Sequence, residues 1–451
     1  MNNQQSTVEK VNGWVKNSVG LKLITITILM LLLLIPASMI KSIISERENM
    51  NQSVLNEVSQ KWAGKQQING PVLCIPLVYE YAIEDEKADT KIITKTKHLY
   101  LLPEQLSING KIEPEKLKRG IYEVVVYRSA LNISGNYKLN LKLDTEGLKE
   151  IKYDKAFLTV GISDLRGIED EIVMNWGKQK LNIQPGSKLS DMISSGVSID
   201  LPNIKDQIDQ SIDFSFQLNL QGSQNLSFIP LGSTTEVDLQ SSWSSPSFNG
   251  NFIPDNREVS DSGFTANWKV LQLNRNYPQT WVSKNMYTAM QYSALGVDLI
   301  MPLDDYQKSM RSAKYAAMTI ALIFLIFFLV EILNGRKIHP FQYALVGLAL
   351  CLFYILLISI SEHSNFNIAY LISASLTSLM ILLYAKSVFK SNKFTGVLSA
   401  TVLGIYSFLF VTLQLADYAL LMGSIGLALI LGITMYFTRN INWYKLNMET
   451  E

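Results

Sequence analysis

The chain has 451 residues, of which 48% are apolar and only 18% are charged. Soluble domains carry about a quarter charged residues, so charge has been excluded from part of this chain. The formal net charge of +1 and the lack of a basic cluster argue against nucleic acid as a partner. Only His98 and Cys74, of three histidines and two cysteines, fall in the polar middle, so we predict no metal site and no cofactor.

The first apolar segment, residues 23–40, carries no charge and approaches the length that crosses a ~30 Å hydrocarbon core. A signal peptide would have a shorter apolar run followed by a small-residue cleavage site. This run continues instead into residues 40–62, where apolar side chains recur at helical spacing. We therefore predict an uncleaved membrane anchor at 23–40, preceded by a short N-terminal segment, 1–22.

The middle segment, 41–314, has the pattern of a β-rich domain with helical stalks. Apolar and polar residues alternate at 212–220 and again at 138–144, which is typical of strands with one buried face. The run PVLCIPLVY at 71–79 predicts a continuously buried strand, and turn clusters at 222–225 and 232–235 follow the alternating segment. We predict an antiparallel, sandwich-like domain.

Five further charge-poor runs fit the length of a membrane span: 315–333, 341–361, 366–385, 394–413 and 418–437. The preceding helix, 304–314, is predicted to start at Asp304 and to continue without a break into the first of these runs. The predicted fold class is thus an α+β membrane protein. It has six transmembrane helices, five of them in a C-terminal bundle at 315–437 before a tail at 438–451, and its large β-rich domain lies between helices 1 and 2.

The orientation follows from the basic residues of the short loops, which favour the cytoplasmic side. Lys and Arg occur in alternate loops of the bundle and in the tail, at Arg336, Lys337, Lys386, Lys390, Lys393, Arg439 and Lys445. Four basic residues lie on the opposite side and do not fit this bias: Lys41, Arg47, Arg311 and Lys314. They flank a long domain, which translocates largely regardless of charge. We predict that both termini are cytoplasmic and that the middle domain lies outside.

Ionisable residues near the predicted spans are the candidate functional residues, because such groups are costly in a membrane. They are Glu331, Glu362, His363 and Asp417. Each lies close to a predicted helix end, so we attribute all four to helix ends that meet water and predict no proton relay. Asp164 and Arg166 of the middle domain are further candidates, interpreted as a structural charge pair beside a turn.

Enzymatic signatures are missing from the sequence, which has no GxxxxGK[ST], GxSxG or HExxH motif, and we predict that the protein is not an enzyme. Two stripes of small residues indicate close helix packing. One comprises Gly396, Ala400 and Gly404, and the other Ala369, Ser373 and Thr377. We interpret both as contacts within the bundle, with homodimerisation as the alternative.

Several segments together resemble the CreD family of bacterial inner-membrane proteins over essentially the whole chain. They are WSSPSFNG at 243–250, GFTANW at 263–268, YQKSMRSAKY at 306–315, HPFQYALVG at 339–347, FYILLISISEHSNFNIAY at 353–370 and the W-x-G and G-P-V of 59–76. Ser245 stands where the family has a histidine, which argues against histidine chemistry there. The family has no catalytic residues to assign.

The resemblance implies a bacterial inner membrane, so that the middle domain lies in the periplasm. It also implies a role in cell-envelope integrity and stress, including colicin tolerance. We expect a non-enzymatic protein whose bundle contacts membrane lipids and whose domain binds a periplasmic lipid, glycan or protein, with homo-oligomerisation left open. One alternative is a transporter or lipid translocator that uses the bundle as its pathway, and another is an enzyme acting on envelope polymers.

Overall fold

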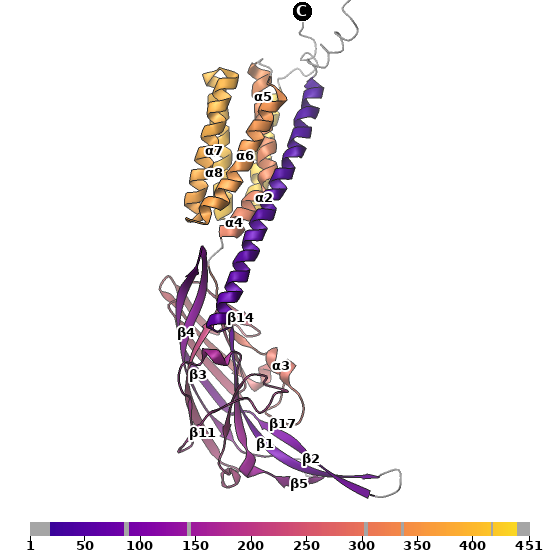
Figure 1. Ribbon diagram of the computed structural model, residues 1–451, viewed down its shortest axis with the longest axis vertical. Coiled ribbons are helices and arrows are strands. Elements are labelled where there is room, and N and C mark those ends of the chain that lie inside the picture. Colours follow the sequence, from indigo (N-terminus) through magenta and orange to yellow (C-terminus); the bar gives the residue numbers. More distant parts are fainter. Residues whose placement is uncertain are drawn as a thin grey trace, which may run out of the picture. The chain divides into compact units, whose positions relative to one another are not determined.

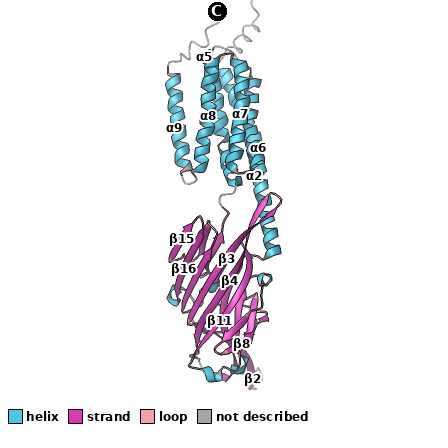
Figure 2. Ribbon diagram, turned by 90° about the vertical axis from the view of Figure 1, so that its left-hand side faces the viewer, coloured by secondary structure: helices cyan, strands magenta, loops and turns pink. Residues whose placement is uncertain are grey.

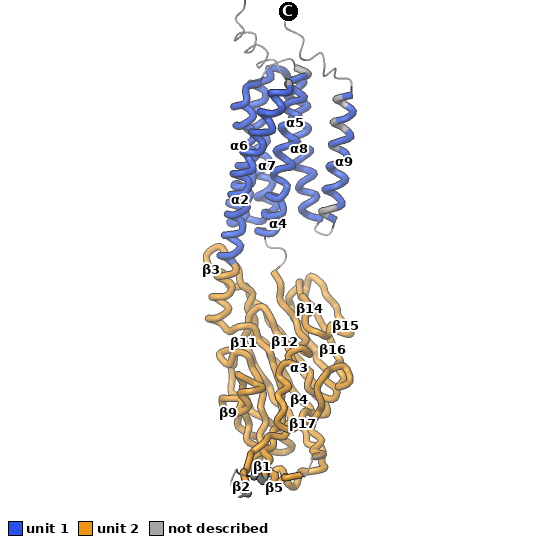
Figure 3. Tube along the Cα trace, turned by 90° about the vertical axis from the view of Figure 1, so that its right-hand side faces the viewer, with its two compact units in different colours: residues 1–51, 303–451 blue, residues 52–302 orange. Residues whose placement is uncertain are grey.

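A computed structural model describes residues 19–84, 90–141, 146–301, 305–334, 338–415 and 418–439. The chain divides into two compact units, one formed by Met1–Asn51 with Leu303–Glu451 and the other by Gln52–Pro302 (Figure 3). Long helices make up the first unit, whereas the second is built of strands with a few short helical turns (Figure 2). The long apolar runs of the sequence thus form the helices of the first unit, and the segments with alternating apolar and polar residues form strands of the second.

The helical unit begins with α2, a single helix over Val19–Trp62 whose last turns belong to the β unit (Figure 1). The remaining helices are α4 (Asp305–Lys314), α5 (Ala316–Asn334), α6 (Pro340–Ser361), α7 (Phe366–Phe389), α8 (Asn392–Gln414) and α9 (Ala419–Thr438). Each of the five C-terminal runs predicted as spans forms a helix whose ends lie within four residues of the prediction, whereas α2 continues 22 residues beyond the predicted first span, 23–40. Among the described residues, four helices are long and apolar enough to cross a membrane, or five if α4 and α5 together form one span.

The prediction of an unbroken helix from Asp304 into the second span is wrong. α4 and α5 meet at a bend of 44° beside Tyr315, and Asp304 lies outside the described residues. α4 carries charges and buries Tyr306 and Ser309, so it packs by an amphipathic face, whereas α5 is apolar along most of its length. Because α4 and α5 have such different surroundings, the chain bends where one helix ends and the other begins.

The β unit contains two sheets. The first has ten strands, with β14, β18, β12, β1, β6, β10 and β9 in order and with β2 and β5 on β1 and β17 on β2. Its bounds are β1 Gln66–Glu84, β2 Thr90–Leu101, β5 Leu148–Ile151, β6 Phe157–Ile162, β9 Gln184–Pro185, β10 Gly196–Asp200, β12 Asn225–Ile229, β14 Pro246–Gly250, β17 Thr280–Val282 and β18 Leu295–Leu299. A short helix, α3 (Tyr287–Gln291), precedes β18.

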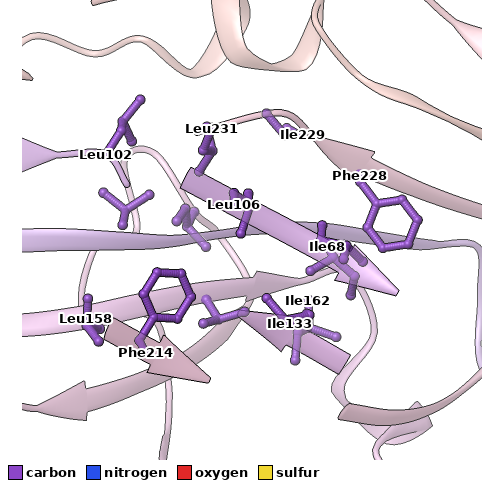
Figure 4. Packing of buried hydrophobic residues seen from close by; sticks show 14 of the residues in the cluster. Ile68, Leu102, Leu106, Ile133, Leu158, Ile162, Phe214, Phe228, Ile229 and Leu231 are labelled. Carbon is purple, nitrogen blue, oxygen red and sulfur yellow. The ribbon is translucent and has the colours of Figure 1, made fainter. Parts of the chain in front are cut away.

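The second sheet has eight strands in the order β15, β16, β13, β3, β4, β11, β7 and β8. Their bounds are β3 Gln105–Arg119, β4 Tyr122–Lys138, β7 Val173–Trp176, β8 Gln179–Asn182, β11 Ser211–Ser223, β13 Thr234–Ser241, β15 Asn256–Ser260 and β16 Gly263–Leu271. Side chains of both sheets form one apolar core, in which Ile68 and Phe228 of the first sheet lie near Ile133 and Phe214 of the second (Figure 4). A shared core between two sheets is the arrangement of a sandwich.

Two details of the predicted strands are corrected. The sheets are mixed rather than antiparallel, because β1 runs parallel to β12 and β3 runs parallel to β13. The alternation predicted at 138–144 does not continue as a strand over the described residues 139–141, since β4 ends at Lys138 and Leu139 is buried in the loop that follows, while 142–144 lie outside the described residues. The buried strand at 71–79 and the alternating strand at 212–220 are confirmed as β1 and β11.

The two stripes of small residues have different environments. Ala369, Ser373 and Thr377 of α7 are completely buried in the bundle, as predicted. On α8, in contrast, Gly396, Ala400 and Gly404 are exposed, and added side-chain atoms at the two glycines would meet open space. The prediction of an intramolecular contact is therefore wrong for the α8 stripe.

Candidate functional site

Glu331, in the last turn of α5, is the most enclosed of the ionisable candidates that the structure describes in the helical unit. Only 5% of the residue is exposed, although α5 ends three residues later. The interpretation of Glu331 as a helix end that meets water is therefore wrong. A buried carboxylate requires partners, because removal of its charge from water is costly.

Three donors surround this carboxylate. The hydroxyl of Tyr343 donates to Oε2 at 2.8 Å, and the backbone N–H of Ile338 donates to Oε1 at 2.6 Å. The ammonium group of Lys22, about a quarter exposed, forms an ion pair with Oε1. The carboxylate thus connects the start of α2, the end of α5 and the start of α6, and we call these four residues the Glu331 clamp.

Local sequence explains why the donors converge. Pro340 occupies the first turn of α6, and the His339 side chain caps that turn by accepting the N–H of Phe341. This cap fixes the segment that presents the Ile338 N–H. The ring of Tyr343 packs against Phe324 and Phe327 of α5, with centroids 5.6 and 6.1 Å away, so apolar rings enclose the polar contacts.

Glu362 follows the end of α6 and lies in a second, weaker cluster. Arg47 of α2 approaches its Oε1 to 3.6 Å, and the Tyr306 hydroxyl of α4 lies 3.4 Å from the same atom. Arg47 is 45% exposed, so this contact is worth little compared with a buried pair. Lys22 and Arg47 lie ~37 Å apart along α2, so the two carboxylates are not brought together.

The other predicted residues form no common site with these carboxylates. His363 is exposed and has no hydrogen-bond or ion-pair partner through its side chain among the described residues. Asp417 lies outside the described residues. Asp164 and Arg166 belong to the β unit.

Asp164 and Arg166 form a two-point contact beside the 3₁₀ turn Leu165–Gly167. Arg166 Nε donates to Oδ1 at 2.9 Å and Nη2 donates to Oδ2 at 2.6 Å. The guanidinium, together with the backbone N–H groups of Gly64 and Arg166, lowers the pKa of Asp164 to about 2. Because the Gly64 N–H binds Oδ2 at 3.0 Å, the carboxylate holds the segment that leads into β1.

Hydroxyl groups without a described hydrogen-bond partner are buried in the bundle, on α4, α7 and α8. They belong to Ser309, Ser312, Ser373, Thr377, Ser378 and Tyr406. The rings of Tyr370 and Tyr406 pack on Phe353 of α6, 5.3 and 4.7 Å away, and the Tyr370 hydroxyl donates to the Tyr406 carbonyl. The interior of this bundle is partly polar, a property that apolar composition does not reveal.

Among the residues that the structure describes, no group of three His, Cys, Asp or Glu side chains could hold a metal ion. Both cysteines are buried and free.

Sequence reasoning missed the partners of Glu331. The sequence pattern assigns no role to Lys22, which precedes the first apolar run, or to Tyr343. The available signal was the carboxylate itself, since a buried acid near the membrane is paired with a base or a donor. The predicted six-span topology places Lys22 and the end of α5 on the same side of the membrane.

These features define a multi-pass membrane protein in which an apolar helical unit carries a large β-sandwich between its first and second helices. The sequence profile of the family "Inner membrane protein CreD" matches residues 18–444. The Inner membrane protein CreD of Escherichia coli (strain K12) is 34% identical over 419 residues, which cover 93% of this chain and 92% of the relative. The chain belongs to the CreD family of inner membrane proteins.

Proposed function

We propose that this protein is a non-enzymatic inner-membrane component that supports cell-envelope integrity through its β unit, acting in the periplasm on a lipid, glycan or protein. The observation that supports the proposal is the separation of the chain into a helical unit and a β unit. The β unit has a continuous apolar core of its own, and the chain leaves it only through α2 and through the segment before α4. A domain with its own core is suited to work in water while helices keep it at the membrane.

The proposed topology has six spans with both termini in the cytoplasm. It takes α5, which follows α4 after a bend of 44°, as the second span and α9, an apolar helix of 20 residues, as the last. The basic residues of the alternate loops support this direction. Reporters that are active only in the periplasm should give signal when fused after Gly250 and none after Lys390. A signal after Lys390 would contradict the six-span topology.

The role of each unit can be separated by complementation in a strain that lacks the protein. Sensitivity to detergent would be compared for the full chain, for residues 1–302, which keep the anchor and the β unit, and for a variant with the β unit deleted. We expect residues 1–302 to restore part of the resistance and the variant without the β unit to restore none. Full rescue without the β unit would contradict the proposal. A bound ligand would then be sought by mass spectrometry of the full chain purified in native lipid.

The transporter alternative is favoured by one observation, the buried hydroxyls of α7 and α8. A polar pathway through the bundle would need such groups, and Ser373 and Thr377 share one face of α7. The test is Ser373→Ala with Thr377→Val, compared with Ser407→Ala on an exposed position of α8. The proposed function predicts unchanged detergent resistance for both variants. Lost resistance in the first variant, with normal amounts and thermal stability, would favour transport.

A further inference from the structure

The helix α4 carries positive charge at the point where the chain enters the second span. Lys308, Arg311 and Lys314 follow one another at intervals of three residues. Tyr306, Ser309, Ser312 and Ala313 form the opposite, buried face. The three cations therefore occupy the remaining surface of an amphipathic helix.

These cations have no anionic partner among the described residues. No carboxylate of the described chain lies within 4.0 Å of Lys308, Arg311 or Lys314. The ammonium of Lys308 lies instead over the ring of Phe366, 5.5 Å from its centroid. Elsewhere in the helical unit, Lys22 and Arg47 are each paired with a glutamate. Among the residues that the structure describes, two cations of α2 are thus paired within the helical unit, whereas the three cations of α4 have no carboxylate within 4.0 Å.

Contacts within the helical unit place α4 at the level where the apolar runs end. Phe366, which Lys308 covers, begins α7, and Glu362, which Tyr306 contacts, follows the last residue of α6. α4 also turns by 44° away from α5 where the apolar sequence begins. An amphipathic helix with cations at this level is suited to lie among lipid headgroups.

The charge of α4 also conflicts with the distribution of the other flanking cations. Arg311 and Lys314 dissent from the positive-inside bias, because they lie at the end of the bundle from which the β unit departs. Cations at a membrane surface are stabilised by the phosphates of anionic lipids. We propose that Lys308, Arg311 and Lys314 bind the phosphate groups of anionic phospholipids in the leaflet at this end of the bundle.

The test is lipid binding to the full-length protein in detergent, measured by native mass spectrometry with phosphatidylglycerol and phosphatidylcholine. The wild type should bind phosphatidylglycerol more tightly than phosphatidylcholine, with a preference that falls at high salt. The variant K308Q/R311Q/K314Q should bind phosphatidylglycerol at least about fivefold more weakly, because each basic side chain near an anionic leaflet contributes about that factor. Its binding of phosphatidylcholine should not change.

Two further variants separate charge from folding. K178Q/K180Q/K205Q removes the same charge from exposed positions of the β unit and should bind like the wild type. K308R/R311K/K314R keeps the charge and should retain the preference. If the triple glutamine variant does not fold, Lys314→Gln, at an exposed position, carries the test with a smaller decrease. Undiminished binding of phosphatidylglycerol, or an equal loss for both lipids, would overturn the proposal.

Discussion

Residues of the Glu331 clamp join three helices through one carboxylate. Lys22 precedes the apolar run of α2, Ile338 precedes α6, and Tyr343 lies in its first turn. A buried acid contributes to stability only while its donors remain, because a single removed partner leaves the others desolvated and unsatisfied. We therefore expect the Glu331 clamp to stabilise the contact of α2, α5 and α6.

Replacement of Glu331 by Ala should lower the free energy of unfolding of the purified protein on the order of 1–3 kcal/mol, because the Tyr343 hydroxyl and the Ile338 N–H lose their acceptor in a buried place. The measurement is thermal unfolding in detergent. Glu46→Ala, on an exposed position of α2, should change the midpoint little. The double variant K22M/E331L should recover part of the loss, since it removes both charges. Equal midpoints for Glu331→Ala and Glu46→Ala would contradict the role of the clamp.

At the scale of single residues, the sequence predicts positions better than partners. It places Glu331 near a helix end, but the closure of that end depends on α2, more than 300 residues earlier in the chain. Asp164 and Arg166 are different, because residues two apart beside a turn meet through local geometry alone. Short-range contacts can thus be predicted from sequence, whereas contacts between distant segments require the fold.

Elements of the bundle were predicted to within a turn because a span leaves a long charge-free run in the sequence. Strand direction was not, because alternation reports which face is buried and says nothing about the direction of a neighbour. β12 pairs with β1 in parallel after the chain has passed through strands of both sheets, a long-range pairing that the alternation pattern does not report. The environment of small residues was equally hidden, since the stripes of α7 and α8 have the same spacing but opposite exposure.

The contact of α6 with α2 and α5 depends on Gly347. A side-chain carbon built there would collide with Leu33 and lie 3.0 Å from Cζ of Phe324. Gly347→Val should therefore destabilise the protein by about 1–3 kcal/mol through overpacking. Gly404→Val is the matched control, because that position of α8 opens to free space. The measurement is again the thermal midpoint in detergent, and a loss for Gly404→Val as large as that for Gly347→Val would show that the packing argument is wrong.

The whole molecule combines two units whose stability has different sources. All buried residues of the β core lie between Ile68 and Leu299, so the bundle contributes none of them. A unit of this size buries enough apolar surface to fold alone. It also lacks a disulfide, since Cys74 is free and buried, and burial raises the pKa of its thiol. A thiol that stays protonated in a closed core is unreactive toward thiol reagents, and a reductant has no disulfide to cleave in this unit.

The separate β unit, residues 52–302, should therefore be soluble and unfold in one cooperative transition when expressed without the bundle. Tryptophan fluorescence in urea should follow this transition, because Trp176 and Trp268 are buried in the core. A reductant should not shift the midpoint, and a thiol reagent should label Cys74 only in the urea range where the fluorescence changes. A broad transition, or labelling of Cys74 before unfolding, would mean that the core is incomplete without the helices. Because the chain leaves the β unit at only two points, we expect its core to be complete without the helices.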